Sequence, residues 1–243
     1  MTTGAETTFP DVLASRLRQD PGQPLVTFYD HGTGERVELS VTTWANWVAK
    51  AGSLLVDELG LERGDRLGID LPPHWLGTVF LGAAWSAGLV VVPTPAPGAD
   101  LEAVVCGPAS VAAWAEQVAS TTVLASALLP LGVRFADALP AGVHDIGVEI
   151  WSQPDAFLPY DPPSGADPAL DPGPTQAELW REAAAGTLVG GGRLLSVANP
   201  VTEPATFCEP LLQGGSLVLV TRAEQDQLEA TYAAERATAR FPA

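Results

Sequence analysis

Basic residues are scarce in this sequence. Its 243 residues include 12 lysines and arginines against 29 aspartates and glutamates, which gives a formal net charge of −17 at pH 7. Lys50 is the only lysine. Such an acidic surface repels the phosphates of nucleic acids and the head groups of anionic membranes, so neither is expected as a partner.

Cysteine and histidine are also rare. Cys106 and Cys208 lie far apart and form no Cys-x-x-Cys pair. One structural disulfide and two buried reduced thiols are both open interpretations, and the second is favoured. The histidines at 31, 74 and 144 lack metal-ligand spacing, so no metal site is predicted. The N-terminal residues MTTGAETTFPDVL do not resemble a signal peptide, and a cytoplasmic location is expected.

One uncharged stretch, residues 75–92, raises the question of a membrane span. Its length is at the lower limit for a transmembrane helix. Glycine and serine interrupt it, and Gly88 divides it into a helix and a β-branched strand that stops at Pro93. We therefore predict a buried helix and strand, with membrane insertion as the alternative.

Apolar residues make up 47% of the chain, which is long enough to bury a large core. Helices are predicted at 9–19, 42–60, 74–87, around 109–119, 175–185, 203–214 and 225–240. Strands are predicted at 24–30, 35–40, 66–71, 89–93, 103–107, 121–126, 134–137, 145–150, 192–198 and 216–220. Apolar strands that alternate with helices indicate an α/β fold, with a mostly parallel sheet or sheets covered by helices on both faces.

The proline-rich segment 152–174 is predicted to connect two α/β lobes. The first lobe spans residues 1–151 and the second, smaller lobe spans residues 175–243. A single compact domain is the alternative.

The order of features from residue 64 to residue 93 is more specific. A Gly64-Asp65-Arg66 turn leads to a strand that ends in Leu-Pro, and the following helix ends in Ala87-Gly88 before a valine-rich strand. Downstream, LLSVANPVTEPATFCEPLLQGGSLVLV gives a further strand–helix–strand unit. With these motifs the chain resembles the N-terminal part of acyl-CoA synthetases and other adenylate-forming (AMP-binding) enzymes. The resemblance covers residues 35–240 and implies their N-terminal fold.

The resemblance also implies where ATP would be held. In the family a Ser/Thr/Gly-rich loop with a lysine follows an Asp-x-Ala start, and its backbone N–H groups hold the phosphates. The matching segment here is Asp167-Pro-Ala-Leu170 followed by DPGPTQAELW, which lacks that loop and its lysine. ATP–Mg²⁺ binding is therefore disfavoured, and no cofactor or catalytic residue is assigned. The family's ribose-binding aspartate and C-terminal catalytic lysine would lie beyond residue 243, so a truncated form is expected.

Three residues are candidate ligand contacts. Ser196 and Asn199 stand where the family's strand ends at its substrate pocket, although Asn199-Pro200 also fits a simple turn. Thr175 lies in the replaced loop, but with Glu178 it also forms the sequence pattern of a helix capping box. Cys106, at a strand end before a helix, is either a nucleophile or a core thiol.

Three hypotheses for function remain. The first is a synthetase-like protein that does not adenylate alone and binds a small acyl or nucleotide-like ligand. The second is an accessory module that pairs with a synthetase-type protein partner. The third is an atypical adenylating acid–thiol ligase, against which the missing phosphate loop counts most.

Overall fold

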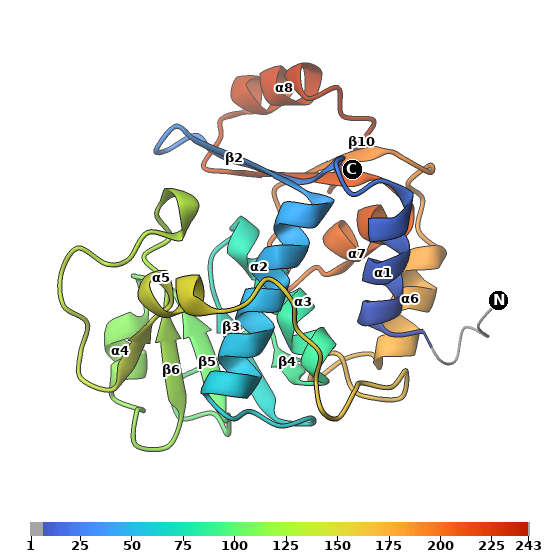
Figure 1. The fold of residues 1–243 in the computed structure, drawn as a ribbon. Helices are drawn as coiled ribbons and strands as arrows, with labels where there is room; N and C mark the ends of the chain where they lie inside the picture. The colour runs from blue at the N-terminus through green and yellow to red at the C-terminus, as the bar shows by residue number, and fades with distance from the viewer. Residues whose placement is uncertain (1–6, 243) are drawn as a thin grey trace.

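The computed structural model describes residues 7–242, which alternate between strands and helices (Figure 1). The strands are β1 (Pro24–Asp30), β2 (Glu35–Ser40), β3 (Arg66–Asp70), β4 (Val90–Val92), β5 (Ala103–Cys106), β6 (Thr122–Ala125), β7 (Val143–Asp145), β8 (Arg193–Ser196), β9 (Ser216–Thr221) and β10 (Ala239–Phe241). The α-helices are α1 (Phe9–Gln19), α2 (Val41–Ser53), α3 (Trp75–Ala87), α4 (Val111–Ala115), α5 (Ile146–Glu149), α6 (Gln176–Ala184), α7 (Ala205–Leu212) and α8 (Gln225–Ala234). A π-helical turn, η1 (Leu54–Glu58), extends α2, and two 3₁₀ turns are η2 (Pro130–Gly132) and η3 (Ile150–Ser152).

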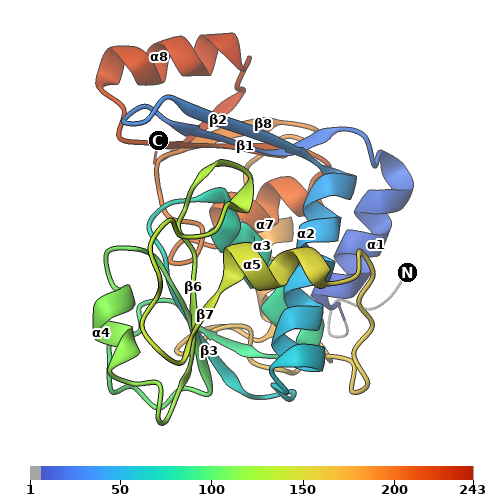
Figure 2. The same ribbon diagram turned by 60° about the vertical axis from the view of Figure 1, so that its left-hand side comes forward.

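The strands form two five-stranded sheets. Sheet A has the order β10-β8-β9-β1-β2, and sheet B has the order β4-β3-β5-β6-β7. Neighbouring strands are parallel throughout, except that β1 and β2 form the predicted antiparallel hairpin. Helices α1, α2, α3, α6 and α7 lie beneath sheet A, and α8 covers its other face (Figures 1 and 2). The predicted α/β class, with mostly parallel sheets covered by helices, is confirmed.

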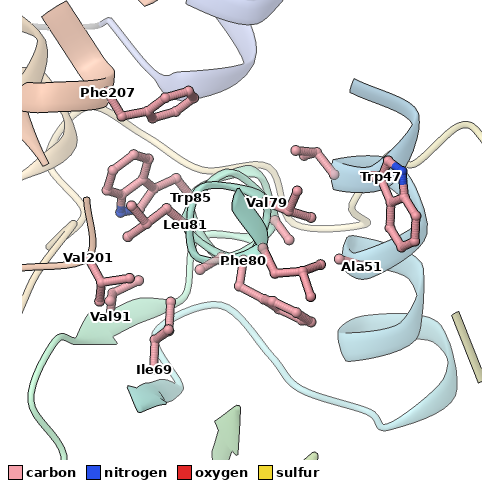
Figure 3. Close-up of a cluster of buried hydrophobic side chains, with 14 of the residues drawn as sticks. Trp47, Ala51, Ile69, Val79, Phe80, Leu81, Trp85, Val91, Val201 and Phe207 are labelled. Carbon is pink, nitrogen blue, oxygen red and sulfur yellow. The ribbon is translucent and has the colours of Figure 1, made fainter. Parts of the chain in front are cut away.

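Helix α3 lies at the centre of the core, where side chains from both sheets and from neighbouring helices surround it (Figure 3). All of its residues are buried, because the segment carries no charge that needs solvent. Burial of each large apolar side chain stabilises the fold by about 2 kcal/mol. Gly88 ends the helix with φ +74°, a left-handed conformation that favours glycine. Within residues 7–242, no helix combines the length and apolar character that a membrane crossing requires.

Sheet B has a second core on the face away from α3. Trp114 of α4 packs there against Val104, Cys106 and Val123. The other two residues of β5, Ala103 and Val105, belong to the central core on the opposite face of the sheet. Because successive strand residues point to opposite faces, apolar runs without alternation suit a sheet that is covered on both sides.

The two sheets divide the chain differently from the predicted lobes. Sheet A combines β1 and β2, near the N-terminus, with β8, β9 and β10, near the C-terminus. Sheet B is built from residues 66–145 alone. The central core draws on residues from Phe9 to Leu219, so it spans both sides of the proline-rich segment.

Two predicted strands are wrong. Residues 134–137 form no strand, with bends at 136 and 137. The segment from Ile146 is helical because Asp145 caps α5 by accepting from the Gly147 N–H at 2.9 Å. The edge strand β7 ends at Asp145, where the helix begins. The predicted final helix is also too long: α8 ends at Ala234, Arg236 takes φ +52°, and β10 follows.

Candidate functional site

Residues 167–175 form a closed turn beside β4, and this stretch is called here the 167–175 turn. The Val91 N–H donates to the Ala169 carbonyl at 3.2 Å, and the Asp171 N–H donates to the Val91 carbonyl at 2.9 Å. The chain then reverses, so that the Ala169 N–H donates to the Pro174 carbonyl at 2.9 Å. The segment that the sequence resemblance aligns with a phosphate loop therefore folds back on itself at the edge of sheet B.

Most of the backbone N–H groups of this turn are already engaged within the protein. Those of residues 167, 169, 170, 171 and 175 each donate to a protein oxygen, and so do those of residues 176, 177 and 178 at the start of α6. Pro168, Pro172 and Pro174 have no N–H to offer. A phosphate cradle needs several free N–H groups that converge on the anion, and this backbone does not supply them.

Both acidic residues of the turn are held in ion pairs. Arg63 donates to the two carboxylate oxygens of Asp167 at 2.7 and 2.8 Å, and Arg66 lies 2.5 Å from a carboxylate oxygen of Asp171. Burial acts to raise the pKa of Asp167, but the hydrogen bonds from Arg63 and Ser164 outweigh it and hold that pKa below its usual range. The turn therefore presents carboxylates, already neutralised by arginine, where a triphosphate would need cations.

Hydrogen bonds from buried residues hold the 167–175 turn against the core. The Trp85 indole N–H donates to the Ala169 carbonyl at 2.9 Å. The fully buried Gln176 donates to the Trp85 carbonyl and accepts from the Phe9 N–H, both at 2.9 Å. These bonds tie Ala169 and the start of α6 to α3 and α1.

Thr175 begins α6 with the predicted capping box. Its hydroxyl accepts from the Glu178 N–H at 3.3 Å, and Glu178 accepts from the Thr175 N–H at 3.0 Å. These backbone and side-chain hydrogen bonds from Thr175 lower the pKa of Glu178. The local geometry is explained by helix capping, and a ligand contact by Thr175 stays a prediction.

Asn199 joins the carboxyl ends of the two sheets. Its Nδ2 donates to the Leu71 carbonyl, just after β3, at 2.8 Å, and its Oδ1 accepts from the Val201 N–H at 3.0 Å. Ser196, the buried last residue of β8, accepts from the Ala198 N–H at 3.1 Å. Leu71, His74, Ser196 and Asn199 are called here the inter-sheet junction. Ligand contacts by Ser196 and Asn199 stay predictions.

His74 is a buried polar group that sequence reasoning did not assign to a site. Its Nδ1 accepts from the Leu76 N–H at 3.2 Å and caps α3, so Nε2 carries the proton of the neutral ring. Nε2 is buried without a hydrogen-bond partner among the described residues. Burial lowers the pKa of His74 to about 4, and the nearby Asp30 only partly opposes it. The ring is therefore a neutral donor at pH 7, and it packs against Phe28 with a centroid separation of 4.7 Å.

The remaining candidates do not form a reactive centre. Cys106 and Cys208 are buried free thiols, as predicted. Burial raises the pKa of Cys106 to about 12, helped by Asp70, so the thiol stays protonated and a nucleophilic role is disfavoured. In the part of the chain that the structure describes, no group of three histidine, cysteine, aspartate or glutamate residues is arranged to hold a metal ion.

Comparison with curated proteins gives one relative along almost the whole chain. A protein of Mycobacterium tuberculosis (strain ATCC 25618 / H37Rv), described as a TIGR03089 family protein, is 32% identical over 241 residues. The match covers 93% of this chain and 95% of that protein. No protein-family model matches the chain.

Solved structures identify the fold. The anthranilate CoA ligase AuaEII in complex with anthranoyl-AMP has a TM-score of 0.77 at 11% identity, and the match covers 97% of this chain and 49% of the ligase. Brucella canis acyl-CoA synthetase has a TM-score of 0.76 at 19% identity, with coverage of 95% and 46%. Mycobacterium tuberculosis fatty acyl CoA synthetase has a TM-score of 0.72 at 15% identity, with coverage of 96% and 48%. The chain thus spans about half the length of these enzymes and has the fold of their N-terminal part, as the sequence resemblance predicts.

Proposed function

The chain belongs to the TIGR03089 protein family, and from this premise we propose that it binds a small acyl or nucleotide-like ligand without adenylating it alone. The observation that carries the proposal is the 167–175 turn. Most of its N–H groups are engaged within the protein, and its carboxylates face Arg63 and Arg66. The third hypothesis, an atypical adenylating ligase, would need phosphate-binding groups from elsewhere.

The inter-sheet junction is the proposed ligand site. It lies where strands of both sheets end, which is the usual position of ligands in open α/β sheets. His74 supplies an unpaired Nε2–H, and Asn199 has a second Nδ2–H beyond the one that it gives to Leu71. Two such donors suit a carboxylate or carbonyl oxygen. The anthranilate CoA ligase with the same fold holds an acyl adenylate, which supports an acyl-type ligand.

A thermal-shift screen with fatty acids, aromatic acids, acyl-CoA and AMP tests ligand binding, with calorimetry for each compound that raises Tm. His74→Asn and Asn199→Ala are expected to weaken binding about tenfold, which corresponds to the loss of one hydrogen bond worth about 1.4 kcal/mol. Ser120→Ala, on an exposed turn after α4, is the control and should bind like the parent protein. If no ligand class binds, or if the junction variants bind as tightly as the control, this site assignment fails.

A protein-binding accessory role is the second candidate function. The chain covers 46% to 49% of the synthetases that share its fold, so a synthetase-type partner would supply the parts that adenylation needs. Co-expression followed by size-exclusion chromatography tests this role, and a stable complex with restored adenylation would support it. We place either activity in the cytoplasm, where buried free thiols stay reduced.

A further inference from the structure

A surface segment follows the outer side of α2. Residues 151–166, called here the strap, continue from η3 and cross in front of α2 (Figure 1). Trp151 packs edge-on against Trp47 with ring centroids 5.3 Å apart. Farther along, the only lysine of the chain, Lys50, lies 3.1 Å from a carboxylate oxygen of Asp155. The strap therefore runs in the same direction as α2 and is fixed to it at successive turns.

Two further contacts fix the middle and the end of the strap. The Phe157 ring lies on Gly52, where an added Cβ would come within 2.7 Å of the ring. Arg63 then holds Asp161 at 3.1 Å, while it also holds Asp167 of the 167–175 turn. The strap is thus a defined element of the surface, although it contains no helix or strand between residues 153 and 166.

The strap also presents large apolar side chains to solvent. Tyr160 is 98% exposed, Leu158 is 89% exposed and Trp151 is 54% exposed. Exposed side chains of this size that are held in place on a fixed backbone are typical of binding surfaces, since aromatic residues dominate interface energetics.

A cavity of about 340 Å³ lies against the strap beside Tyr160. Its apolar lining comes from Val56, Leu61, Ala87 and Pro159. Three charged side chains also line it, those of Glu62, Arg63 and Asp161. The cavity is large enough for the apolar stem of one long side chain and has carboxylates for the end of that side chain.

Charge at this surface is predominantly negative. Exposed carboxylates surround the strap at Asp57, Glu58, Glu62, Asp155 and Asp161. The two cations of the region, Lys50 and Arg63, are already paired with aspartates. A second copy of a chain with net charge −17 and an anionic membrane would both be repelled. Complementarity therefore favours a basic occupant.

We propose that the strap and its cavity dock a protein partner through a basic side chain flanked by apolar residues. The aliphatic stem of an arginine or lysine would fill the apolar part of the cavity, and its cationic group would lie near Glu62 and against the Tyr160 ring. Leu158 and Trp151 would contact the flanking apolar residues. The inference extends the accessory role given above as the second candidate function, and it does not require ligand binding at the inter-sheet junction.

The test uses a fluorescent nonapeptide of alternating leucine and arginine, capped at both ends, and a counterpart with glutamate in place of arginine. Fluorescence anisotropy measures binding to the whole chain, and hydrogen exchange maps the contact. The arginine peptide is expected to bind, to protect amides of the strap, and to lose at least tenfold in affinity with the double variant Leu158→Ser/Tyr160→Ser. The control is Val189→Ser, at a side chain that is 82% exposed away from the strap, and it should leave the affinity for the peptide unchanged.

Each contrary outcome overturns the proposal. Absence of binding, equal affinity for the double variant, or protection away from the strap would show that this surface does not select a basic apolar partner. Equal binding of the glutamate peptide would exclude charge complementarity. Self-association of the parent chain that the double variant abolishes, detected by sedimentation, would make a second copy the occupant. Calorimetry of the same double variant with acyl ligands shows separately whether the inter-sheet junction still binds.

Discussion

His74 begins α3 with one ring nitrogen and leaves the other buried without a partner. Both facts follow from its position after two prolines, at the point where a strand end turns into the most buried helix of the fold. Because the ring is neutral and out of water, protonation is costly. Because protonation of His74 is unfavourable in the folded state, the free energy of unfolding depends on pH through this residue.

The pH dependence of unfolding should therefore change when His74 is replaced by asparagine, which keeps a capping oxygen but does not titrate. In the native state the pKa of His74 is about 4, against its ordinary value of 6.5, so the unfolded state binds the proton more readily between these values. Stability should fall as the pH is lowered from 6.5 to 4, by on the order of 3 kcal/mol from this residue.

Urea unfolding at several pH values from 4 to 7 measures that effect. The His74→Asn variant should lose most of the acid sensitivity that the parent protein shows in this range. His144→Asn, at a partly exposed histidine beside Glu149, controls for replacement at the surface. Parallel stability curves for the parent and His74→Asn would contradict the buried neutral ring.

Arg63 connects two surface elements, the strap and the 167–175 turn. Its guanidinium holds Asp167 with two hydrogen bonds and Asp161 with one, and its stem packs against Gly88, where a Cβ would lie 2.8 Å away. Arg63→Met should destabilise the fold by about 1–3 kcal/mol, because Asp167 would keep its partly buried charge without that partner. Hydrogen exchange should quicken in residues 167–175. Arg181→Met, at an exposed position of α6, is the matched control; an equal effect there would contradict the role of Arg63.

Gly52 tests how the strap is attached to α2. Alanine favours a helix over glycine by about 1 kcal/mol, yet a Cβ here would lie 2.7 Å from the Phe157 ring. Gly52→Ala should therefore destabilise the parent protein and increase proteolysis of the strap, but should stabilise a Phe157→Ala background. Chemical denaturation of the four proteins in this double-mutant cycle measures the coupling. Additive effects would show that Phe157 does not pack on Gly52.

At the level of single elements, local sequence patterns predict most of the helices and strands. The β1–β2 hairpin, the central α3 and the capping box at Thr175 follow from alternation, an uncharged apolar run and a Thr-x-x-Glu pattern. Residues 145–150 are misassigned, since an aspartate cap outweighs an apolar run that is too short to show a period. The strand β10 is missed because it depends on pairing with the distant β8.

The site was less predictable than the fold. The family resemblance located the replaced loop at 167–175, but Arg63 and Arg66 lie about a hundred residues earlier in the chain, so their pairs with Asp167 and Asp171 depend on tertiary structure. The same holds for Asn199, whose amide reaches Leu71 across the two sheets. His74 left no signal, because histidine is not among the residues that usually cap helices.

At the scale of the whole molecule, the chain has two mostly parallel sheets, the fold of the N-terminal part of acyl-CoA synthetases, and a closed turn where the sequence resemblance implies a phosphate loop. The turn does not offer a converging set of free N–H groups, and on this we base the proposal of a binding role without adenylation. In the two proposals made above, the surface strap contacts a protein and the inter-sheet junction contacts a ligand.

The most direct test is a hydroxylamine trap for acyl adenylates, run with ATP, Mg²⁺ and a panel of aliphatic and aromatic acids on rigorously purified protein. We expect no hydroxamate and no acid-dependent release of pyrophosphate above the level without protein. A catalytically competent acyl-CoA synthetase assayed in parallel shows that the trap works. Hydroxamate formation that co-purifies with the parent protein and disappears when Asn199 or His74 is replaced would contradict the account.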